Sequence, residues 1–460
     1  MNQGRGSLKA SIIGTGYVGL VSGVCLAELG HDVICVDIDE DRVKSLNAGV
    51  SPIYEPNLDS ILQRALDTRG IRFTADISEA LEHSSIQFIA VGTPTDENGG
   101  ADLKYVEQVA LEIGQQMRIP QVVVLKSTVP VGTTAAVAAL ISQRLISRGL
   151  DPSSLLHTVS NPEFLREGHA VQDFMQPDRI VIGSDSEYAL ETLTELYSPL
   201  GLSDDQLILT SSQTSELIKY SANAMLAIRV SFINEIAILA EHYQADIEFI
   251  SRGLGMDPRI GPHFLQAGPG FGGSCLPKDL RALIQMASEA NQQLPVIEGA
   301  YKSNELQLHR LSAKVKAVLG ENLADHTLAV WGVAFKAETD DAREAPSLTI
   351  IDDLIRAGAK INAVDPQVSD REIYSNFSQK SVMRFAEPLD ALEDASALII
   401  ITDWSQFKSV SPKEISARMK GTLVVDGRNI FSDAQLEGSG ITYLPVGKPA
   451  KLENTTYATE

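Results

Sequence analysis

Short apolar runs alternate with amphipathic stretches from residue 8 to about residue 203 of the chain. Each run has the length of one buried strand, and the stretches between the runs carry apolar residues at helical spacing. This alternation is typical of βαβ units that build a parallel sheet. The clearest strand candidates are residues 11–13, 33–37, 88–91 and 122–125.

The middle of the chain has a different pattern. Residues 212–244 contain neither glycine nor proline and carry apolar groups at helical spacing, which predicts one long helix. Further helix is expected from Asp279 to about Leu319, with an interruption near Pro295. From Thr327 the alternating pattern returns, and it fades into a polar tail after Pro449.

The two outer regions echo each other. In both, an acidic stretch precedes an apolar run, and a second predicted strand ends in an acid, Asp37 or Asp365. We therefore predict an α/β protein with two Rossmann-like parallel-sheet domains joined by a long central helical region. The alternative to a duplicated architecture is that the two regions share only the general features of α/β segments. The predicted divisions are 1–203, 204–320, 321–449 and a polar tail, 450–460.

The composition restricts the partners more than the fold. The chain has 460 residues and a formal net charge of −22, with a pI near 4.8. An acidic chain argues against binding to nucleic acid, because phosphate backbones require clustered basic side chains. A small anionic ligand stays open, since a few placed basic groups reverse the field locally.

The cysteines and the apolar runs indicate the cellular setting. Cys25, Cys35 and Cys275 are too few for a disulfide framework and lack metal-ligand spacing, so we expect a reducing compartment and no metal site. No run approaches the ~18 consecutive apolar residues of a membrane span, and the polar start of the chain lacks a hydrophobic signal region. These features predict a cytoplasmic protein without a membrane span.

A glycine-rich turn, GTGYVG over residues 14–19, follows the first predicted strand and opens the first predicted helix. Gly14, Gly16 and Gly19 would allow a tight turn and a close approach of the backbone to a pyrophosphate. Asp37 ends the next strand, where its carboxylate would bind a ribose diol and repel a 2′-phosphate. The pattern predicts NAD rather than NADP; the alternative is a simple turn and a solvated acid. Arg42 would lie either against the adenine or in solvent.

A second glycine-rich segment, GPGFGGSCLPKD over residues 268–279, surrounds Cys275. Four glycines indicate a loop whose backbone passes close to a ligand. The helix predicted from Asp279 would place the thiol just before its N-terminus, where the macrodipole favours the nucleophilic thiolate. The alternative is an inert cysteine in a structural turn.

These segments, with several others, resemble the UDP-glucose/GDP-mannose dehydrogenase family over nearly the whole chain. Many motifs in one order make the resemblance specific, although residues 331–335 (WGVAF) lack the full glycine fingerprint. The second nucleotide domain would therefore bind its ligand differently from the first. The further motifs are residues 91–95 (VGTPT), 126–132 (KSTVPVG), 161–168 (NPEFLREG), 219–223, 331–336 and 426–428 (DGR).

The resemblance implies a covalent mechanism that agrees with the local chemistry. Cys275 would capture an aldehyde as a thiohemiacetal, which loses a second hydride to give a thioester that water hydrolyses. Lys219 and Asn223, one turn apart on the predicted helix, would stabilise each oxyanion, unless they form only an exposed polar face.

Three more residues receive catalytic roles from the resemblance. Glu163 would be the general base for hydrolysis, and Thr128 and Asp279 would hold a water together with Lys219. The sequence leaves open which group takes the first alcohol proton.

The resemblance also implies two sets of binding residues. The cofactor set is Gly14, Gly16, Tyr17, Val18, Gly19, Asp37, Arg42, Thr93, Thr128, Glu167 and Arg343. The substrate set is Glu163, Phe164, Leu165, Arg166, Lys219, Asn223, Arg259, Phe264, Leu265, Gly268, Phe271, Gly272, Phe335, Lys336 and Arg428. Arg259 would reach the sugar in a neighbouring subunit, which implies a homodimer through the central helices. Solvated surface arginines are the alternative for Arg259, Arg343 and Arg428.

The resemblance therefore implies a four-electron, NAD-dependent oxidation of the C6 alcohol of UDP-glucose to UDP-glucuronate. A sibling substrate, GDP-mannose or a UDP-N-acetylhexosamine, would require nearly the same motifs. A two-electron hydroxyacid dehydrogenase would need neither the cysteine loop nor a second nucleotide domain. A non-catalytic nucleotide-sugar sensor would not need the complete set of catalytic residues.

Overall fold

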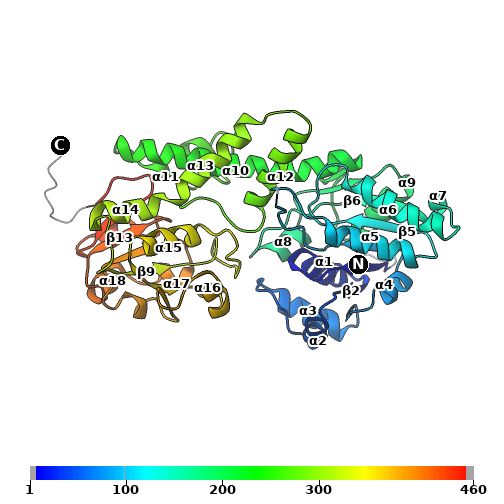
Figure 1. Cartoon of the computed structure of the whole chain (residues 1–460), viewed down its shortest axis with the longest axis horizontal. Helices are drawn as coiled ribbons and strands as arrows, with labels where there is room; N and C mark the ends of the chain where they lie inside the picture. The colour runs from blue at the N-terminus through cyan, green and yellow to red at the C-terminus, as the bar shows by residue number, and fades with distance from the viewer. Residues whose placement is uncertain (1–6, 98, 452–460) are drawn as a thin grey trace. The chain divides into compact units, whose positions relative to one another are not determined.

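The computed structural model describes residues 7–97 and 99–451 (Figure 1). The chain forms two compact units, Met1–Ala222 with Arg281–Gln292, and Asn223–Leu280 with Gln293–Glu460. Most of the predicted polar tail, residues 452–460, lies outside the described residues.

The first unit contains one eight-stranded sheet with the order β3-β2-β1-β4-β5-β6-β7-β8. Neighbouring strands run parallel except β6 and β7, which meet in one antiparallel pair, Ser160 with Gly183. The strands are β1 (Lys9–Ile13), β2 (Asp32–Val36), β3 (Ile71–Thr74), β4 (Ile86–Ile89), β5 (Gln121–Leu125), β6 (Leu156–Ser160), β7 (Ile180–Gly183) and β8 (Leu207–Thr210).

Helices connect these strands and cover both faces of the sheet (Figure 1). They are α1 (Tyr17–Glu28), α2 (Glu40–Asn47), α3 (Leu58–Asp67), α4 (Ile77–His83), α5 (Lys104–Gln116), α6 (Thr133–Ser147), α7 (Pro152–Leu155), α8 (Ala170–Met175) and α9 (Glu187–Tyr197), with short 3₁₀ turns η1 (Ser198–Leu200) and η2 (Asp204–Gln206).

Alternation along the strands explains why the sheet has two cores. On β1, Ile12 packs into the core under α1, α3, α8 and α9, whereas Ile13 packs into the core under α4, α5 and α6. Successive side chains of a strand point to opposite faces, so a strand that is buried on both sides is apolar throughout. This is the arrangement that the apolar runs predict.

Helix α10 (Ser212–His242) begins in the first unit and ends in the second. It confirms the single long helix expected from residues 212–244. Among the described residues it is the one helix long and apolar enough to cross a bilayer by length and composition. However, Lys219, Asn223 and Asn234 on α10 are buried and form polar contacts with other protein segments, which is typical of a helix in a protein core.

The second unit contains a six-stranded parallel sheet with the order β11-β10-β9-β12-β13-β14. Its strands are β9 (Thr327–Trp331), β10 (Lys360–Val364), β11 (Val382–Phe385), β12 (Ala397–Ile400), β13 (Leu423–Asp426) and β14 (Thr442–Pro445). Counted along the chain, this order is that of the first six strands of the first sheet. The doubled Rossmann-like architecture is therefore confirmed.

Helices also cover both faces of the second sheet (Figure 1). They are α11 (Ile247–Gly255), α13 (Pro295–Leu308), α14 (Arg310–Leu319), α15 (Pro346–Arg356), α16 (Asp370–Asn376), α17 (Ser405–Lys408), α18 (Pro412–Arg418) and α19 (Asp433–Leu436), with the 3₁₀ turn η3 (Asp390–Leu392). Helix α12 (Leu276–Glu289) begins in the second unit and ends in the first. It begins three residues before Asp279, the start expected from the sequence.

Candidate active site

In the glycine-rich turn between β1 and α1, Gly19 is tightly packed, whereas Gly16 faces open space. A Cβ on Gly19 would lie 1.9 Å from the Gly14 carbonyl oxygen, so only glycine permits this turn. A Cβ on Gly16 would meet nothing within 4 Å, and Gly16 provides no side-chain cap for the N-terminus of α1. The unfilled space at a helix N-terminus fits the pyrophosphate of a dinucleotide.

Asp37 follows β2 and holds the glycine turn in place. Its Oδ2 atom accepts hydrogen bonds from Thr15 N at 3.0 Å and Thr15 Oγ1 at 2.5 Å, and Arg42 Nη1 lies 3.5 Å away. Burial would raise the pKa of Asp37, but the hydrogen bonds from Thr15 and Asp39 and the charge of Arg42 lower it below its ordinary value. Asp37 is therefore an ionised carboxylate, and a contact of Arg42 with adenine stays a prediction.

Tyr17 connects the glycine turn to the segment that carries Glu163 and Glu167. Its hydroxyl donates to the carboxylate of Glu55, which also accepts hydrogen bonds from Gly168 N at 2.7 Å and Ala170 N at 2.8 Å. Burial and then Glu55 raise the pKa of Tyr17 far above its usual range, so the phenol stays protonated. Glu55 thus joins two loops that the sequence assigns to the site.

Thr93 and Thr128 come from neighbouring loops at the carboxyl ends of β4 and β5. Thr93 Oγ1 donates to the Thr128 carbonyl at 2.9 Å, which fixes one loop against the other. The carboxyl ends of parallel strands are where nucleotides bind in sheets of this kind.

Lys219 and Glu163 form a buried ion pair. Lys219 Nζ lies 2.9 Å from Glu163 Oε1, and each side chain is 5% exposed. Burial would raise the pKa of Glu163, but the Lys219 ammonium lowers it below its ordinary value, so the carboxylate is ionised. The alternative that Lys219 is part of an exposed polar face is therefore wrong.

A second ammonium group, that of Lys126, is buried in the same unit. Its Nζ donates to Asn161 Oδ1 at 3.3 Å, and Tyr197 donates to the same oxygen at 2.6 Å. Burial lowers the pKa of Lys126 to about 8. The charge of Lys219 lowers this pKa further, whereas the charge of Glu163 raises it. Lys126 begins the motif of residues 126–132, but no role was predicted for it from the sequence.

The residues that follow Glu163 differ in what their side chains do. Phe164 presents its ring to the guanidinium of Arg179, 3.6 Å from the ring centroid, and Leu165 N donates to Glu163 Oε2 at 2.5 Å. The Arg166 guanidinium is engaged with Asp173, at 2.6 Å between Nη2 and Oδ1. Substrate contacts by these three residues stay predictions.

In the second unit, Cys275 lies immediately before α12, and its thiol is exposed. Asp279 N donates to the Cys275 carbonyl at 2.9 Å, so Cys275 is at the N-terminal end of the helix. Cys25 and Cys35, by contrast, are buried, and burial raises the pKa of both thiols. Exposure at a helix N-terminus favours a reactive thiolate and argues against the inert-cysteine alternative.

Asp279 is buried one turn into α12 and contacts Asn223 and Lys278. Asn223 Nδ2 donates to its Oδ2 atom at 2.5 Å, and Lys278 Nζ lies 2.5 Å from Oδ1. Asn223 is itself only 7% exposed. Asn223 is thus held by a carboxylate of the cysteine helix.

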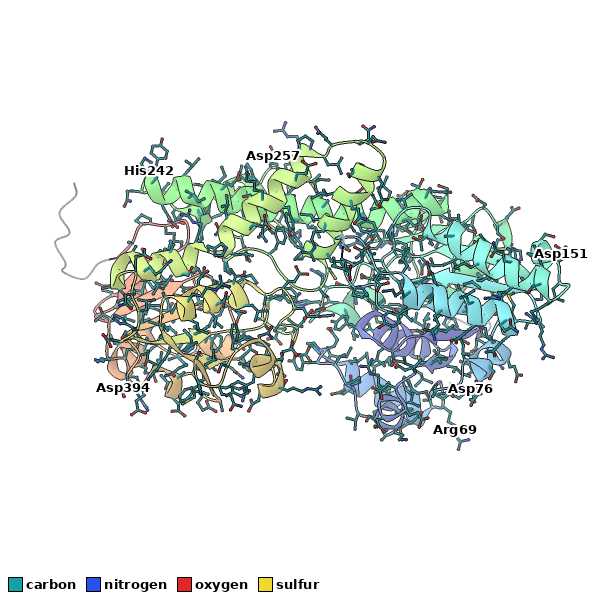
Figure 2. The ribbon with its side chains drawn as sticks, viewed as in Figure 1. Arg69, Asp76, Asp151, His242, Asp257 and Asp394 are labelled. Carbon is teal, nitrogen blue, oxygen red and sulfur yellow. The ribbon has the colours of Figure 1, made fainter. Side chains whose placement is uncertain are left out.

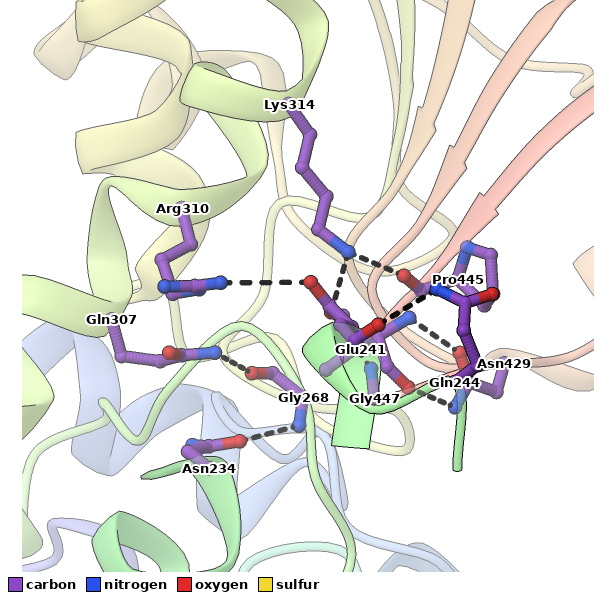
Figure 3. A network of polar contacts seen from close by, with 11 residues as sticks. Asn234, Glu241, Gln244, Gly268, Gln307, Arg310, Lys314, Asn429, Pro445 and Gly447 are labelled. Atoms are coloured by element: carbon purple, nitrogen blue, oxygen red, sulfur yellow. Dashed lines mark hydrogen bonds and ion pairs between the residues drawn. The ribbon is translucent and has the colours of Figure 1, made fainter. Parts of the chain in front are cut away.

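The glycine-rich cysteine loop packs against the segment that joins β9 to α15. A Cβ on Gly272 would lie 2.2 Å from the Glu344 carbonyl oxygen, so the close approach requires glycine. Gly268 N donates to Asn234 Oδ1 at 2.8 Å, and Gln307 Nε2 donates to the Gly268 carbonyl at 2.7 Å (Figure 3). The loop is therefore fixed at its start, at Gly268, and closely packed at Gly272 by residues of its own unit.

Three residues of the predicted substrate set meet at the carboxyl ends of β9 and β13. Arg428 follows β13 and donates to the Phe335 carbonyl at 3.3 Å, and to the carbonyl of Ile401, which follows β12, at 2.8 Å. Lys336 Nζ lies 5.4 Å from the centroid of the Phe335 ring. A guanidinium and an ammonium at this sheet edge suit a diphosphate.

Other predicted residues have contacts within the chain. Phe264 has a φ of 60°, a strained backbone for a bulky residue, beside the buried Leu265. Phe271 is buried, and its N–H donates to Asn304 Oδ1 at 2.8 Å.

Two of the predicted arginines pair with acids nearby in the sequence. Arg259 is 88% exposed and pairs with Asp257, which Figure 2 labels in the segment after α11. Arg343 pairs with Asp341 through two nitrogen atoms, each at 2.8 Å. Their sugar and cofactor contacts stay predictions.

Family models account for both sheets and the helical region between them. The NAD binding domain of the UDP-glucose/GDP-mannose dehydrogenase family matches residues 8–201, its central domain residues 213–306, and its UDP binding domain residues 329–433. The chain belongs to the UDP-glucose/GDP-mannose dehydrogenase family. As a member of it, the protein is an NAD-dependent nucleotide-sugar dehydrogenase.

Relatives of this dehydrogenase family match over nearly their full length. The chain is 42% identical to a UDP-glucose 6-dehydrogenase of Rhizobium meliloti, over 96% of this chain and 100% of the relative. A UDP-glucose dehydrogenase from Pyrobaculum islandicum has a similar structure, with a TM-score of 0.87, 34% identity and coverage of 97% and 99%. A UDP-D-ManNAc dehydrogenase from Pyrococcus horikoshii has a TM-score of 0.84, 27% identity and coverage of 96% and 99%.

Sequence reasoning missed three buried or stacked groups of this dehydrogenase. Glu55 lies between two prolines without apolar periodicity, and Arg179 carries no motif, so no pattern singled out either residue. Glu216 did leave a signal, because it stands three residues before Lys219 on the same predicted helix.

Proposed function

We propose that the protein oxidises the C6 alcohol of UDP-glucose to the carboxylate of UDP-glucuronate, with two NAD molecules consumed per sugar. The observation that carries the proposal is the exposed Cys275 thiol at the N-terminus of α12. A simple two-electron alcohol dehydrogenase has no need of such a nucleophile.

The first oxidation removes a hydride from C6 and a proton from the alcohol, which gives an aldehyde. NAD, when bound, accepts the hydride of each oxidation. The thiolate of Cys275 adds to the aldehyde carbon, and the carbonyl oxygen becomes the oxyanion of a thiohemiacetal. Lys219 and Asn223 stabilise that oxyanion, because an ammonium and an amide N–H both interact favourably with its negative charge.

The second oxidation removes the remaining hydrogen on C6 as a hydride, which leaves a thioester on Cys275. Water attacks the thioester carbon, the bond to sulfur breaks, and the product leaves as a carboxylate. Glu163 takes a proton from that water, a role that requires an ionised carboxylate, and the pKa of Glu163 is below its ordinary value. Asp279 and Thr128 hold the water.

Binding divides between the two units. The glycine turn, Asp37 and the loops of Thr93 and Glu167 hold NAD, because they supply the open helix N-terminus and an ionised acid for the ribose. Lys336 and Arg428 hold the diphosphate of the sugar nucleotide.

A second candidate substrate is a UDP-N-acetylhexosamine. The observation in its favour is the likeness to a UDP-D-ManNAc dehydrogenase, with a TM-score of 0.84. GDP-mannose is a third nucleotide sugar that the same chemistry would serve. The higher identity to a UDP-glucose 6-dehydrogenase, 42%, favours UDP-glucose.

The protein works as a homodimer through its central helices and resides in the cytoplasm. Large apolar side chains are exposed along one stripe of α10, at Met225, Phe232 and Leu239, which are 58%, 45% and 52% exposed. Their seven-residue spacing places them on one face, as in a helix–helix interface. Buried thiols at Cys25 and Cys35 suit a reducing compartment.

The stoichiometry of the reaction tests the proposal. Limiting UDP-glucose with excess NAD should yield two NADH per sugar, with no aldehyde captured by a trapping amine and a product identified by mass as UDP-glucuronate. One NADH per sugar with a trapped aldehyde would reject the covalent mechanism. GDP-mannose and UDP-N-acetylmannosamine, assayed in parallel, should give much lower kcat/KM values; a higher value for either would move the substrate assignment to it.

A further inference from the structure

Glu216 is a buried carboxylate in the second turn of α10 that takes no part in the proposed chemistry. Its side chain accepts three hydrogen bonds from the start of α6: from Gly132 N at 2.7 Å, Thr134 N at 2.8 Å and Thr134 Oγ1 at 2.7 Å. The residue is 2% exposed. Helix α6 has no cap of its own, because Gly132 stands at its N-cap position. Glu216 therefore supplies that cap from another helix.

The three hydrogen bonds join two segments of the proposed site. Gly132 ends the loop 126–132, which begins at the end of β5 and contains Thr128. Lys219 stands three residues after Glu216 on α10, one turn further along the helix, and pairs with Glu163 at 2.9 Å. The height and rotation of this part of α10 thus depend on how Glu216 docks on α6.

A carboxylate suits this position in a way that an amide does not. Both oxygens of Glu216 accept hydrogen bonds from backbone N–H groups at once. A glutamine of the same shape has one accepting oxygen, and its NH₂ group would face one of those N–H donors. The negative charge of Glu216 also interacts favourably with the positive end of the α6 dipole.

We propose that Glu216 is a positioning residue for the dehydrogenase reaction, which holds the Lys219 turn of α10 in register with the Thr128 loop through the N-terminus of α6. The inference rests on the proposed role of Lys219 in stabilising the oxyanions. Displacing a catalytic group by about 1 Å can slow a reaction by on the order of a hundredfold, so small movements of this turn should be measurable.

The test compares Glu216→Gln with a matched control on the same helix. Glu241, near the other end of α10, accepts a hydrogen bond from Gly447 N at 2.8 Å and pairs with Lys314 at 2.6 Å (Figure 3). Glu241→Gln therefore removes a carboxylate that also accepts a backbone hydrogen bond but lies 22 residues from Lys219 along the chain. We expect Glu216→Gln to lower kcat by about tenfold or more, with both KM values nearly unchanged. Glu241→Gln should lower only the Tm.

A double-mutant cycle with Lys219→Ala identifies the route of the effect. If Glu216 acts through Lys219, Glu216→Gln should have little further effect on kcat in the Lys219→Ala background. Equal losses in both backgrounds would overturn the inference, as would a Glu216→Gln enzyme with normal kcat and only a lowered Tm. Wild-type turnover by Lys219→Ala would instead reject the proposed function of Lys219, which separates the two failures.

Thr134→Val provides a second variant should Glu216→Gln fail to fold. It removes one donor to Glu216 and keeps the shape of the side chain and both backbone donors. The inference requires a smaller fall in kcat, again with KM unchanged. A kcat equal to that of the wild type would contradict it.

Discussion

The Lys126 ammonium is buried near the Lys219–Glu163 pair, and its pKa of about 8 lies well below its ordinary 10.5. The depressed pKa means that the folded protein holds the charged lysine at a cost, because burial removes water from the ammonium. Below pH 8 that cost is present in full. Between pH 8 and pH 10.5 the folded state has lost a proton that the unfolded chain keeps, so this group makes stability rise with pH.

We therefore predict that Lys126→Met removes this rise. The pKa difference corresponds to ~3 kcal/mol at about 1.36 kcal/mol per pKa unit. The free energy of unfolding, measured with urea at pH 7 and pH 10 for both proteins, should show the wild type gaining on the variant as pH increases. A difference that stays constant with pH would mean that Lys126 is not held with a depressed pKa.

At the scale of single residues, the sequence led to predicted chemical roles, whereas most side-chain contacts came only from the structure. Roles for Cys275 and Asp37 were predicted from their places beside glycine motifs, and the role of Lys219 was implied by the family resemblance; all three stay predictions. No role was predicted for Glu55, because its partners Tyr17, Gly168 and Ala170 are far away in sequence and two of them donate through backbone N–H groups. Only the tertiary fold brings such groups together.

Among the elements, the glycine-rich cysteine loop and α12 determine where the thiol lies. Gly272 approaches the Glu344 carbonyl so closely that an added Cβ would be 2.2 Å from the oxygen and 2.8 Å from Pro346 Cδ. Pro346 is the first residue of α15, which has buried residues of its own, and Glu344 lies two residues before it. The loop therefore has to move if Gly272 gains a side chain.

Gly272→Ala should displace the loop and slow NADH formation by about tenfold or more, while overpacking lowers the free energy of unfolding by about 1–3 kcal/mol. Gly299→Ala on α13 is the control, because a Cβ there meets nothing within 4 Å. A helical alanine should leave activity unchanged and stabilise the protein slightly. Equal activity and stability for both variants would show that the approach of Gly272 to Glu344 is not tight.

The elements themselves followed the sequence pattern closely. The long helix, several strands of each sheet and the interruption near Pro295 were predicted from periodicity and from the absence or presence of glycine and proline. Helix α12 begins at Leu276, three residues before the predicted Asp279, so Pro277 lies in its first turn. Proline is tolerated in the first turn of a helix, where no N–H partner is lost.

At the scale of the whole molecule, the exposed apolar stripe of α10 supports a second copy as its partner. Phe232, in the middle of the stripe, is 45% exposed. Phe232→Glu would place a charge in the proposed interface without a partner, which is strongly unfavourable. The variant should sediment as a monomer of about half the wild-type mass.

The control for this prediction is Met383→Glu, since Met383 is 58% exposed on β11 and lies outside the central helices. It should keep the wild-type mass. A wild-type protein that is already monomeric at micromolar concentration would reject the dimer. Loss of the dimer should also lower turnover if Arg259 reaches a neighbouring sugar site.

The path of the chain through the two units has a consequence for synthesis on the ribosome. The first unit is made of Met1–Ala222 and Arg281–Gln292, so residues 223–280, which belong to the second unit, emerge before its last segment. At about 5–20 residues per second, translation of these roughly 60 residues takes about 3–12 s. During that interval the nascent first unit lacks the end of α12, and its surface there is open to chaperones or to premature association with other nascent chains.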